Sequence, residues 1–174
     1  LADDGTVHTR KVPSTIDDYG RGIVEGVAQV FRDTGITAAD IDAVLHGTTV
    51  ASNAILEMAG ARTGLITTAG FRDVLELRTL RMPRLYDIGW TKPTPLVERY
   101  MRIGVDERVH ADGTIETPID REGVARAVDQ LVADDVESIA VCLINSFANA
   151  QHEREIGEII EERAPGVAYC LSVD

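Results

Sequence analysis

A compact group of polar side chains follows a short apolar run in the first third of the chain. It contains a histidine, a glycine, two hydroxyls and an amide: His46, Gly47, Thr48, Thr49 and Asn53. If the apolar run is a strand and a helix begins near Val50, the free N–H groups of the helix N-terminus lie beside these side chains. This arrangement can bind an anion, because open α/β sheets bind ligands outside the carboxyl ends of their strands. The alternative is structural: a threonine caps the helix, and the imidazole is hydrogen-bonded within the fold.

A second polar group has the same layout one structural unit later. The apolar run "ARTGLITT" ends in Thr67 and Thr68, and Gly70, Arg72 and Asp73 follow it before the segment "FRDVLEL" continues as a short helix. In a parallel sheet this strand end lies at the same edge as the first one. Arg72 then meets a bound anion or pairs with an acidic neighbour at the surface, and the spacing leaves both roles open.

Further arginines follow in a segment interrupted by prolines, between residues 78 and 95. Arg78, Arg81 and Arg84 stand close to Tyr86 and Trp90. The prolines predict an irregular loop. Its arginines are candidates for an anionic substrate or a partner subunit, and the alternative is a set of solvated or surface-paired cations.

Other catalytic machinery is missing from the sequence. The chain has no G-x-x-x-x-G-K-[ST] segment, and no G-x-S-x-G segment. His152-Glu153 is not followed by a second histidine one helical turn later, which excludes the zinc-protease helix. We expect no metal site. Cys142 and Cys170 lie in apolar runs, which predicts buried, reduced thiols.

The composition limits the classes of partner. The 174 residues carry 29 acidic and 17 basic side chains, a net charge of −12. Nucleic-acid binding is disfavoured, because it needs a basic face. No run approaches the ~20 apolar residues of a membrane span and no signal peptide is visible, so we expect no membrane association and a cytoplasmic location. The start at Leu1 suggests that residues upstream are missing.

The hydrophobic pattern alternates between strands and helices. Strands are expected at Thr6–Val12, from Ala43, over 61–68, 138–145 and 167–173. Helices are expected after a capping box of Ser14 and Asp17, over Val50–Met58, over 71–77, after Asp120 and after Asn149. Ile103 to Thr117 alternates around Asp112-Gly113 and predicts a hairpin. This order predicts an α/β fold: a mixed, mainly parallel sheet with helices on both faces, an inserted hairpin and an irregular loop.

Six segments together resemble the N-terminal region of the hydantoinase A/5-oxoprolinase family. They cover almost the whole chain in the family's order: "HGTTVASNAILE", "GARTGLITTAGFRDVLEL", "PRLYD", "KPTPLVERY", "RVHADG" and "IAVCLINSFANAQHE". The resemblance implies half of a ribonuclease-H/actin-like ATPase fold, of the superfamily that includes sugar kinases and Hsp70. It also implies ATP hydrolysis coupled to the opening of a cyclic amide, with ATP and Mg²⁺ bound by the full-length protein.

The resemblance also implies roles for individual residues. It places His46 and Asn53 as catalytic candidates, and Gly47, Thr48, Thr49, Thr67, Thr68, Gly70, Arg72 and Asp73 near the substrate or phosphate, with Arg78 and Arg81 as second-rank candidates. A hydantoinase B-type subunit or domain is the implied partner, which makes a hetero-oligomer the expected assembly.

The implied family pattern is longer than this chain. Residues 1–174 correspond to a fragment of the N-terminal actin-like domain without its first phosphate-loop strand, with a possible subdomain at 79–174. We expect the fragment alone to be inactive and to bind no nucleotide tightly. Two alternatives remain: a subunit of an ATP-dependent ketone carboxylase, and a non-catalytic assembly or binding module. The substrate itself is not readable from the residues.

Overall fold

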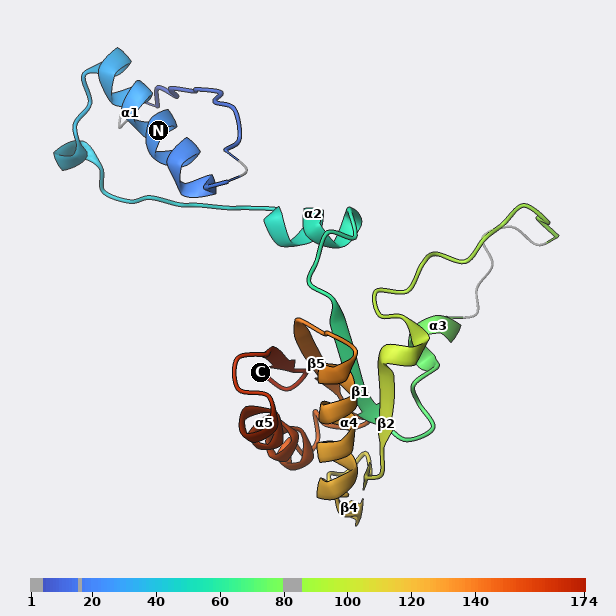
Figure 1. The fold of residues 1–174 in the computed structure, drawn as a ribbon. Coiled ribbons are helices and arrows are strands. Elements are labelled where there is room, and N and C mark those ends of the chain that lie inside the picture. Colours follow the sequence, from blue (N-terminus) through green and yellow to red (C-terminus); the bar gives the residue numbers. More distant parts are fainter. Residues whose placement is uncertain (1–4, 16, 80–85) are drawn as a thin grey trace. The chain divides into compact units, whose positions relative to one another are not determined.

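The computed structural model describes residues 5–15, 17–79 and 86–174 (Figure 1). The chain divides into two compact units, Leu1–Thr48 and Thr49–Asp174, which we call unit 1 and unit 2. This division lies earlier in the chain than the possible boundary at residue 79. The apolar core belongs to unit 2, and Gly22 is the only buried residue among the described residues of unit 1.

Unit 1 is built around helix α1 (Tyr19–Thr34). Its predicted C-terminal stop is confirmed, because Gly35 has φ 74° and its N–H donates to the Phe31 carbonyl. The predicted capping box was wrong in its position. Asp18 is the N-cap, and its Oδ1 accepts from the N–H groups of Gly20 at 3.0 Å and Arg21 at 3.3 Å.

The N-cap of α1 makes a testable contribution. Asp18→Ala leaves two N–H groups of the first turn without their acceptor, and should lower the free energy of unfolding of unit 1 by about 1 kcal/mol. Asp17→Ala is the matched control, because Asp17 makes only an exposed ion pair with Arg21 and should change stability by less than about 0.5 kcal/mol. Urea titration followed by far-UV circular dichroism measures both, and equal effects would contradict the capping role.

The two strands predicted for unit 1 are not formed in this chain. Residues 6–12 and 41–49 are without strand assignment, and Leu45 is 98% exposed. A strand needs a hydrogen-bonded neighbour, and none pairs with these segments among the described residues. The prediction of strands in these two segments was therefore wrong.

Unit 2 contains a four-stranded, wholly parallel sheet in the order β2-β1-β5-β6. The mainly parallel α/β fold expected from the sequence is confirmed. The sheet is preceded by α2 (Val50–Leu56), and the strands are β1 (Thr63–Thr68), β2 (Arg102–Val105), β5 (Ser138–Cys142) and β6 (Ala168–Leu171).

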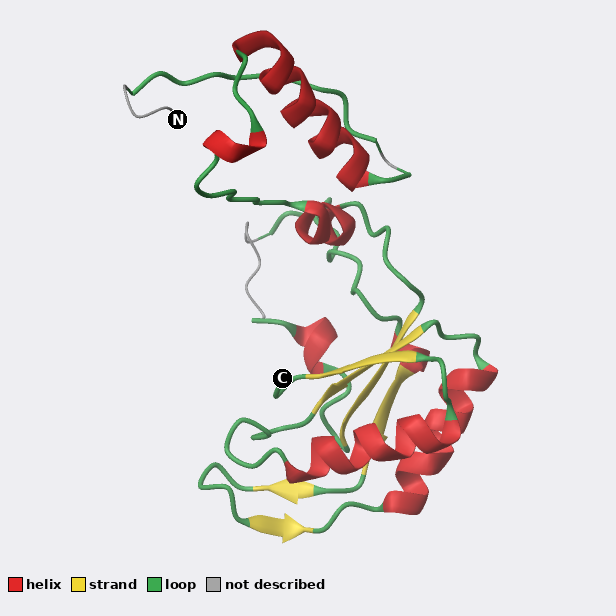
Figure 2. Ribbon diagram, turned by 90° about the vertical axis from the view of Figure 1, so that its left-hand side faces the viewer, coloured by secondary structure: helices red, strands yellow, loops and turns green. Residues whose placement is uncertain are grey.

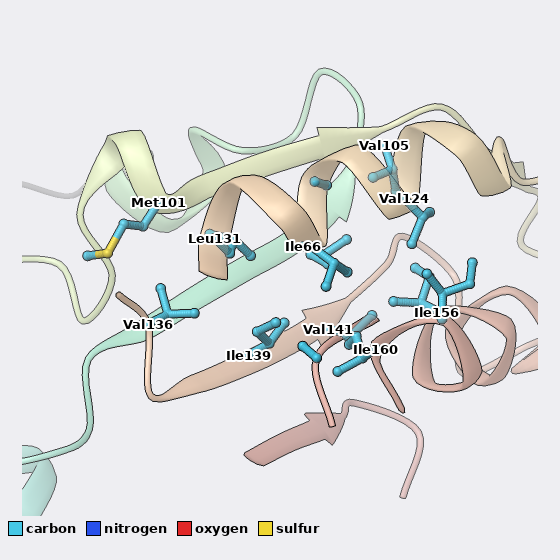
Figure 3. Close-up of a cluster of buried hydrophobic side chains, with 14 of the residues drawn as sticks. Ile66, Met101, Val105, Val124, Leu131, Val136, Ile139, Val141, Ile156 and Ile160 are labelled. Carbon is cyan, nitrogen blue, oxygen red and sulfur yellow. The ribbon is translucent and has the colours of Figure 1, made fainter. Parts of the chain in front are cut away.

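Helices α4 (Arg121–Ala133) and α5 (Gln151–Arg163) lie side by side below the sheet in Figure 2. Alternate strand residues face them, such as Ile66 and Val141, and form the core shown in Figure 3 together with helix residues such as Leu131 and Ile160. Gly64 lets α4 approach β1 closely, since a Cβ built there would lie 2.6 Å from Leu131 Cδ2. β1 and the nearly continuous apolar run of β5 occupy the two central positions of the sheet.

The other face of the sheet carries the alternate residues. At the β2 edge it holds the buried Arg102, which contacts Glu76 of the short helix α3 (Val74–Leu77). Cys142 and Cys170 also lie on this face, and both are exposed, so the prediction of buried thiols was wrong. Beside Cys142, Val141 is buried because it points toward the helices, and beside Cys170, Tyr169 and Leu171 are partly buried on that same face, whereas the cysteines point away.

The predicted hairpin is confirmed at its turn and corrected at its first strand. β3 (Arg108–Val109) pairs antiparallel with β4 (Ile115–Thr117), and Gly113 adopts φ 84° in the turn. Ile103 and Val105 belong instead to β2, so the alternating run is divided between the sheet and the hairpin. Two 3₁₀ turns complete the described elements, at Ala38–Asp40 and Arg99–Met101. No described helix is long and apolar enough to cross a membrane.

Candidate functional site

Unit 1 contains a small pocket that includes two of the predicted residues. His46 and Thr48 line it together with hydroxyl side chains and an apolar wall, in a volume of about 220 Å³. We call it the hydroxyl pocket. Its lining residues are Val12, Pro13, Ser14, Thr15, Tyr19, Gly22, Ile23, His46 and Thr48.

Local contacts of α1 shape one wall of the hydroxyl pocket. The Thr15 hydroxyl donates to the Asp18 carbonyl and accepts from the Gly22 N–H at 3.1 Å. Gly22 permits this contact, because a Cβ there would lie 3.1 Å from the same oxygen. The lining of the pocket thus combines an imidazole and hydroxyl groups with aliphatic carbon, a composition suited to a small ring with one polar edge.

The rest of the first predicted group lies outside this pocket. Gly47 is exposed, and the boundary between the units falls between Thr48 and Thr49. Thr49 is the residue before α2, and its carbonyl accepts from the Asn53 N–H at 2.8 Å. Asn53 is exposed on α2. The structure therefore brings together His46 and Thr48, while Thr49 and Asn53 belong to unit 2.

In unit 2 the second predicted strand end leads into a buried polar cluster. The Thr68 hydroxyl donates to Glu107 Oε1, and its oxygen accepts from the Ile144 N–H at 3.0 Å. Glu107 Oε2 lies 2.9 Å from His152 Nδ1. Thr68, Glu107 and His152 are 0%, 4% and 2% exposed. The Thr68 hydroxyl is thus engaged within the protein.

Glu153 forms the second half of the same cluster. It is 0% exposed. Its Oε1 accepts from the Leu143 N–H at 2.8 Å and from the Ser172 hydroxyl at 2.7 Å, while Oε2 accepts from the Val173 N–H at 3.2 Å. We call Thr68, Glu107, His152 and Glu153 the strand-end cluster.

Of the remaining residues of the second predicted group, Thr67 lies in β1, and Gly70, Arg72 and Asp73 lie on the loop between β1 and α3. Thr67 is buried, Gly70 adopts φ 88°, and Arg72 is exposed. Asp73 pairs with Arg99 through two hydrogen bonds of 2.8 and 3.0 Å. Pairing with an acidic neighbour such as Asp73 was one of the two roles left open for Arg72, and in the structure Asp73 pairs with Arg99 instead.

The ion pair of Asp73 predicts a measurable titration. The hydrogen-bonded Arg99 guanidinium holds the pKa of the Asp73 carboxyl below its ordinary value. Arg99→Met should raise that pKa, whereas Arg72→Met should raise it less, because Arg72 acts only through its charge. Since the folded pKa is lowered, the pair stabilises the protein above the unfolded pKa of about 3.9 and loses its effect as the pH falls through the folded pKa. Carboxyl ¹³C shifts followed against pH measure this, and an unchanged titration in Arg99→Met would contradict it.

The predicted arginine candidates have different environments. Arg78 is exposed, with φ 54° at the end of α3, and Arg81 lies outside the described residues. Arg102 was not predicted as a site residue. It is almost fully buried, and its Nε donates to the Val97 carbonyl at 2.8 Å. Among the described residues, no group of three or more His, Cys, Asp or Glu side chains is arranged to hold a metal ion.

Sequence reasoning also missed Glu107, His152 and Glu153 as members of a site. His152-Glu153 was considered only as part of a zinc motif. The available signal was a pair of ionisable residues just after a helix-capping asparagine, close to the end of the apolar strand over 138–145. That signal does not identify Glu107, which lies 45 positions from His152 in the sequence.

Three relatives share sequence with nearly all of the chain. It is 33% identical to caprolactamase subunit alpha of Pseudomonas jessenii, over 98% of this chain and 25% of that subunit. It is 33% identical to the acetophenone carboxylase gamma subunit of Aromatoleum aromaticum, over 91% of this chain and 23% of that subunit. It is 29% identical to 5-oxoprolinase 1 of Arabidopsis thaliana, over 86% of this chain and 14% of that protein. The chain thus spans a quarter or less of the length of these relatives.

A solved structure and a family model agree with these relatives. The crystal structure of the ATP-dependent caprolactamase from Pseudomonas jessenii matches 99% of this chain, and 26% of that chain, with a TM-score of 0.81 and 32% identity. The model of the hydantoinase/oxoprolinase N-terminal region matches residues 1–164. With its parallel sheet and its polar strand ends, the chain belongs to the hydantoinase/oxoprolinase N-terminal region family.

Proposed function

We propose that this chain is the N-terminal part of an enzyme that couples ATP hydrolysis to the opening of a cyclic amide. The observation that carries the proposal is the 33% identity to caprolactamase subunit alpha over 98% of this chain. The solved caprolactamase is described as ATP-dependent, and 5-oxoprolinase 1 is a further relative. Both relatives are named for reactions of cyclic amides.

The proposed chemistry addresses a poor electrophile. An amide carbonyl resists attack by water, and phosphorylation of its oxygen by ATP supplies a leaving group. The hydroxyl pocket supports this proposal, because its aliphatic wall fits ring methylenes while its hydroxyls and imidazole suit the polar amide edge. In this scheme His46 donates or accepts a proton at the substrate, and Thr48 orients the amide.

We also propose roles for the other predicted site residues. For Asn53 we propose a catalytic role, and for Gly47 and Thr49 we propose binding of substrate or phosphate through their backbone N–H groups. Thr67, Gly70, Arg72 and Asp73 are proposed to form the loop that faces phosphate, with Arg78 and Arg81 contacting an anionic substrate or a partner. The exposure of Arg72 and the left-handed conformation at Gly70 support that role for the loop.

ATP with Mg²⁺ is the proposed co-substrate of the whole protein. The residues of this chain are proposed to contribute part of that site and to bind Mg²⁺-ATP weakly by themselves. Calorimetry of the 174-residue chain tests this, and tight binding of Mg²⁺-ATP would contradict it.

A multi-subunit assembly is also proposed. Two relatives are named as subunits, alpha of caprolactamase and gamma of acetophenone carboxylase, which supports a hetero-oligomer. We propose a hydantoinase B-type subunit or domain as the partner. A cytoplasmic location is proposed as well, and the two free, exposed cysteines suit a reducing compartment.

A ketone carboxylase is the second candidate, because the acetophenone carboxylase gamma subunit is as similar in sequence as the caprolactamase subunit. The experiment that separates them is phosphate release by the full-length protein with its partner, using hydantoin, 5-oxoproline, caprolactam, and ketones with bicarbonate. Release with a cyclic amide alone supports the hydrolase, release only with a ketone and bicarbonate supports the carboxylase, and release with none supports a non-catalytic module.

A further inference from the structure

The strand-end cluster links four strands of unit 2 through one turn of one helix. Thr68 ends β1, Glu107 lies two residues after β2, Leu143 follows β5 and Ser172 follows β6. His152 and Glu153 are the second and third residues of α5. His152 contacts Glu107, which in turn contacts Thr68, and Glu153 contacts Leu143 and Ser172.

The hydrogen bonds of the cluster form two branches. In the first, His152 contacts Glu107, Glu107 accepts from the Thr68 hydroxyl, and Thr68 accepts from the Ile144 N–H. In the second, Glu153 accepts from the Leu143 and Val173 N–H groups and from the Ser172 hydroxyl. Leu143 and Ile144 are neighbours, so the branches meet at the end of β5.

The cost of burying these groups argues for a geometric role. In the part of the chain that the structure describes, neither Glu107 nor Glu153 pairs with an arginine or lysine, although both are almost fully buried. Buried carboxylates lose much hydration free energy, and well-packed apolar residues often stabilise a fold as well or better. The oxygens of these two carboxylates, in contrast, accept several hydrogen bonds each, and so fix the positions of the groups that donate to them.

Backbone hydrogen bonds connect the strand-end cluster to the loop of residues 69–73. The Ala69 N–H donates to the Val105 carbonyl at 2.9 Å, and the Phe71 N–H donates to the Thr68 carbonyl at 3.0 Å. Thr68 is therefore held through its hydroxyl by Glu107 and Ile144 and through its carbonyl by Phe71. The next residue, Ala69, is fixed to the end of β2 by its own N–H. The position of Thr68 determines where the loop leaves the sheet, just before Gly70, Arg72 and Asp73.

We propose that the strand-end cluster is a positioning device for the loop of residues 69–73, acting through Thr68. The importance of this loop for turnover rests on the function proposed above, but its positioning by the cluster does not. No cluster residue needs to touch substrate in this scheme, which agrees with their burial. The cluster and the hydroxyl pocket then have different roles, one fixing backbone and the other contacting substrate.

Hydrogen exchange tests the positioning without any assay of activity. In the full-length protein, Thr68→Val removes the hydroxyl at nearly constant shape, and should accelerate amide exchange of residues 69–73 about tenfold or more. Thr68→Ser keeps the hydroxyl and should restore exchange to near the original rate. Glu162→Gln, an exposed change on α5, is the control and should leave exchange unchanged. If Thr68→Val does not fold, Glu107→Gln, which removes one acceptor charge at constant shape, replaces it with the same expectation.

Kinetics then separate positioning from simple stability. At a temperature where every variant is folded, Thr68→Val should lower kcat for ATP-coupled turnover about tenfold, and Thr68→Ser should recover most of it. Unchanged loop exchange in a folded Thr68→Val protein would overturn the proposal, as would a lower melting temperature with unchanged loop exchange and kcat. Absence of turnover in the unmodified protein would overturn the proposed function instead, while the exchange result would still decide the positioning.

Discussion

Glu153→Ala is expected to lower the free energy of unfolding by about 1–3 kcal/mol, the usual cost of one buried donor left unpaired. The carboxylate of Glu153 accepts from the Leu143 and Val173 N–H groups and from the Ser172 hydroxyl. Its removal leaves the buried Leu143 N–H at the end of β5 without its acceptor, whereas the Val173 N–H is half-buried and the exposed Ser172 hydroxyl keeps its contact with Ser146. Urea denaturation of the 174-residue chain, followed by far-UV circular dichroism, measures the change.

The control for this change lies on the same helix. Glu162 is exposed on α5, and Glu162→Ala should alter the free energy of unfolding by less than about 0.5 kcal/mol. A loss below about 1 kcal/mol in Glu153→Ala would mean that water replaces the carboxylate without cost, and would contradict a tightly satisfied cluster.

His46→Ala is expected to lower ATP-coupled ring opening by the full-length protein about 100-fold, the scale typical for loss of a positioned acid–base group. His46 lines the hydroxyl pocket with Thr48 and Tyr19, so its imidazole is available to a molecule bound there. The measurement is kcat/KM for phosphate release and for the opened product, with the partner subunit present.

A second histidine provides the control for His46. His110 is exposed near the hairpin turn, and its Nε2 lies 3.6 Å from the Glu116 carboxylate. His110→Ala should therefore leave kcat/KM within about twofold. Equal activity of the two variants would remove His46 from the proposed site.

The parallel sheet could be predicted because its two central strands lie in apolar runs that are visible in the local sequence. β5 lies in a nearly continuous apolar run, a pattern typical of strands in a parallel sheet, and β1 has Leu65 and Ile66 between threonine and glycine residues. β2 could not be assigned, because its residues Ile103 and Val105 continue the alternation of the hairpin that follows. Only pairing with β1, some 37 positions earlier at Ile66↔Ile103, decides its place, and such long-range pairing leaves no local pattern.

The candidate site was predictable to a similar degree. The polar residues after the two apolar runs include His46 and Thr48, which line the hydroxyl pocket, and Thr68, which belongs to the strand-end cluster. Glu107 was not identifiable, because an isolated glutamate in an alternating segment is typical of a solvated strand face. The exposed thiols show the same limit, since an apolar run does not reveal which of its two faces a helix covers.

The most direct test of the proposed activity is the stoichiometry of ATP use by the full-length protein with its partner. With caprolactam, hydantoin or 5-oxoproline as substrate, we expect one phosphate released for each ring opened, and neither product when ATP or the cyclic amide is omitted. Ring opening without ATP consumption, or phosphate release that requires a ketone and bicarbonate instead of a cyclic amide, would contradict the account.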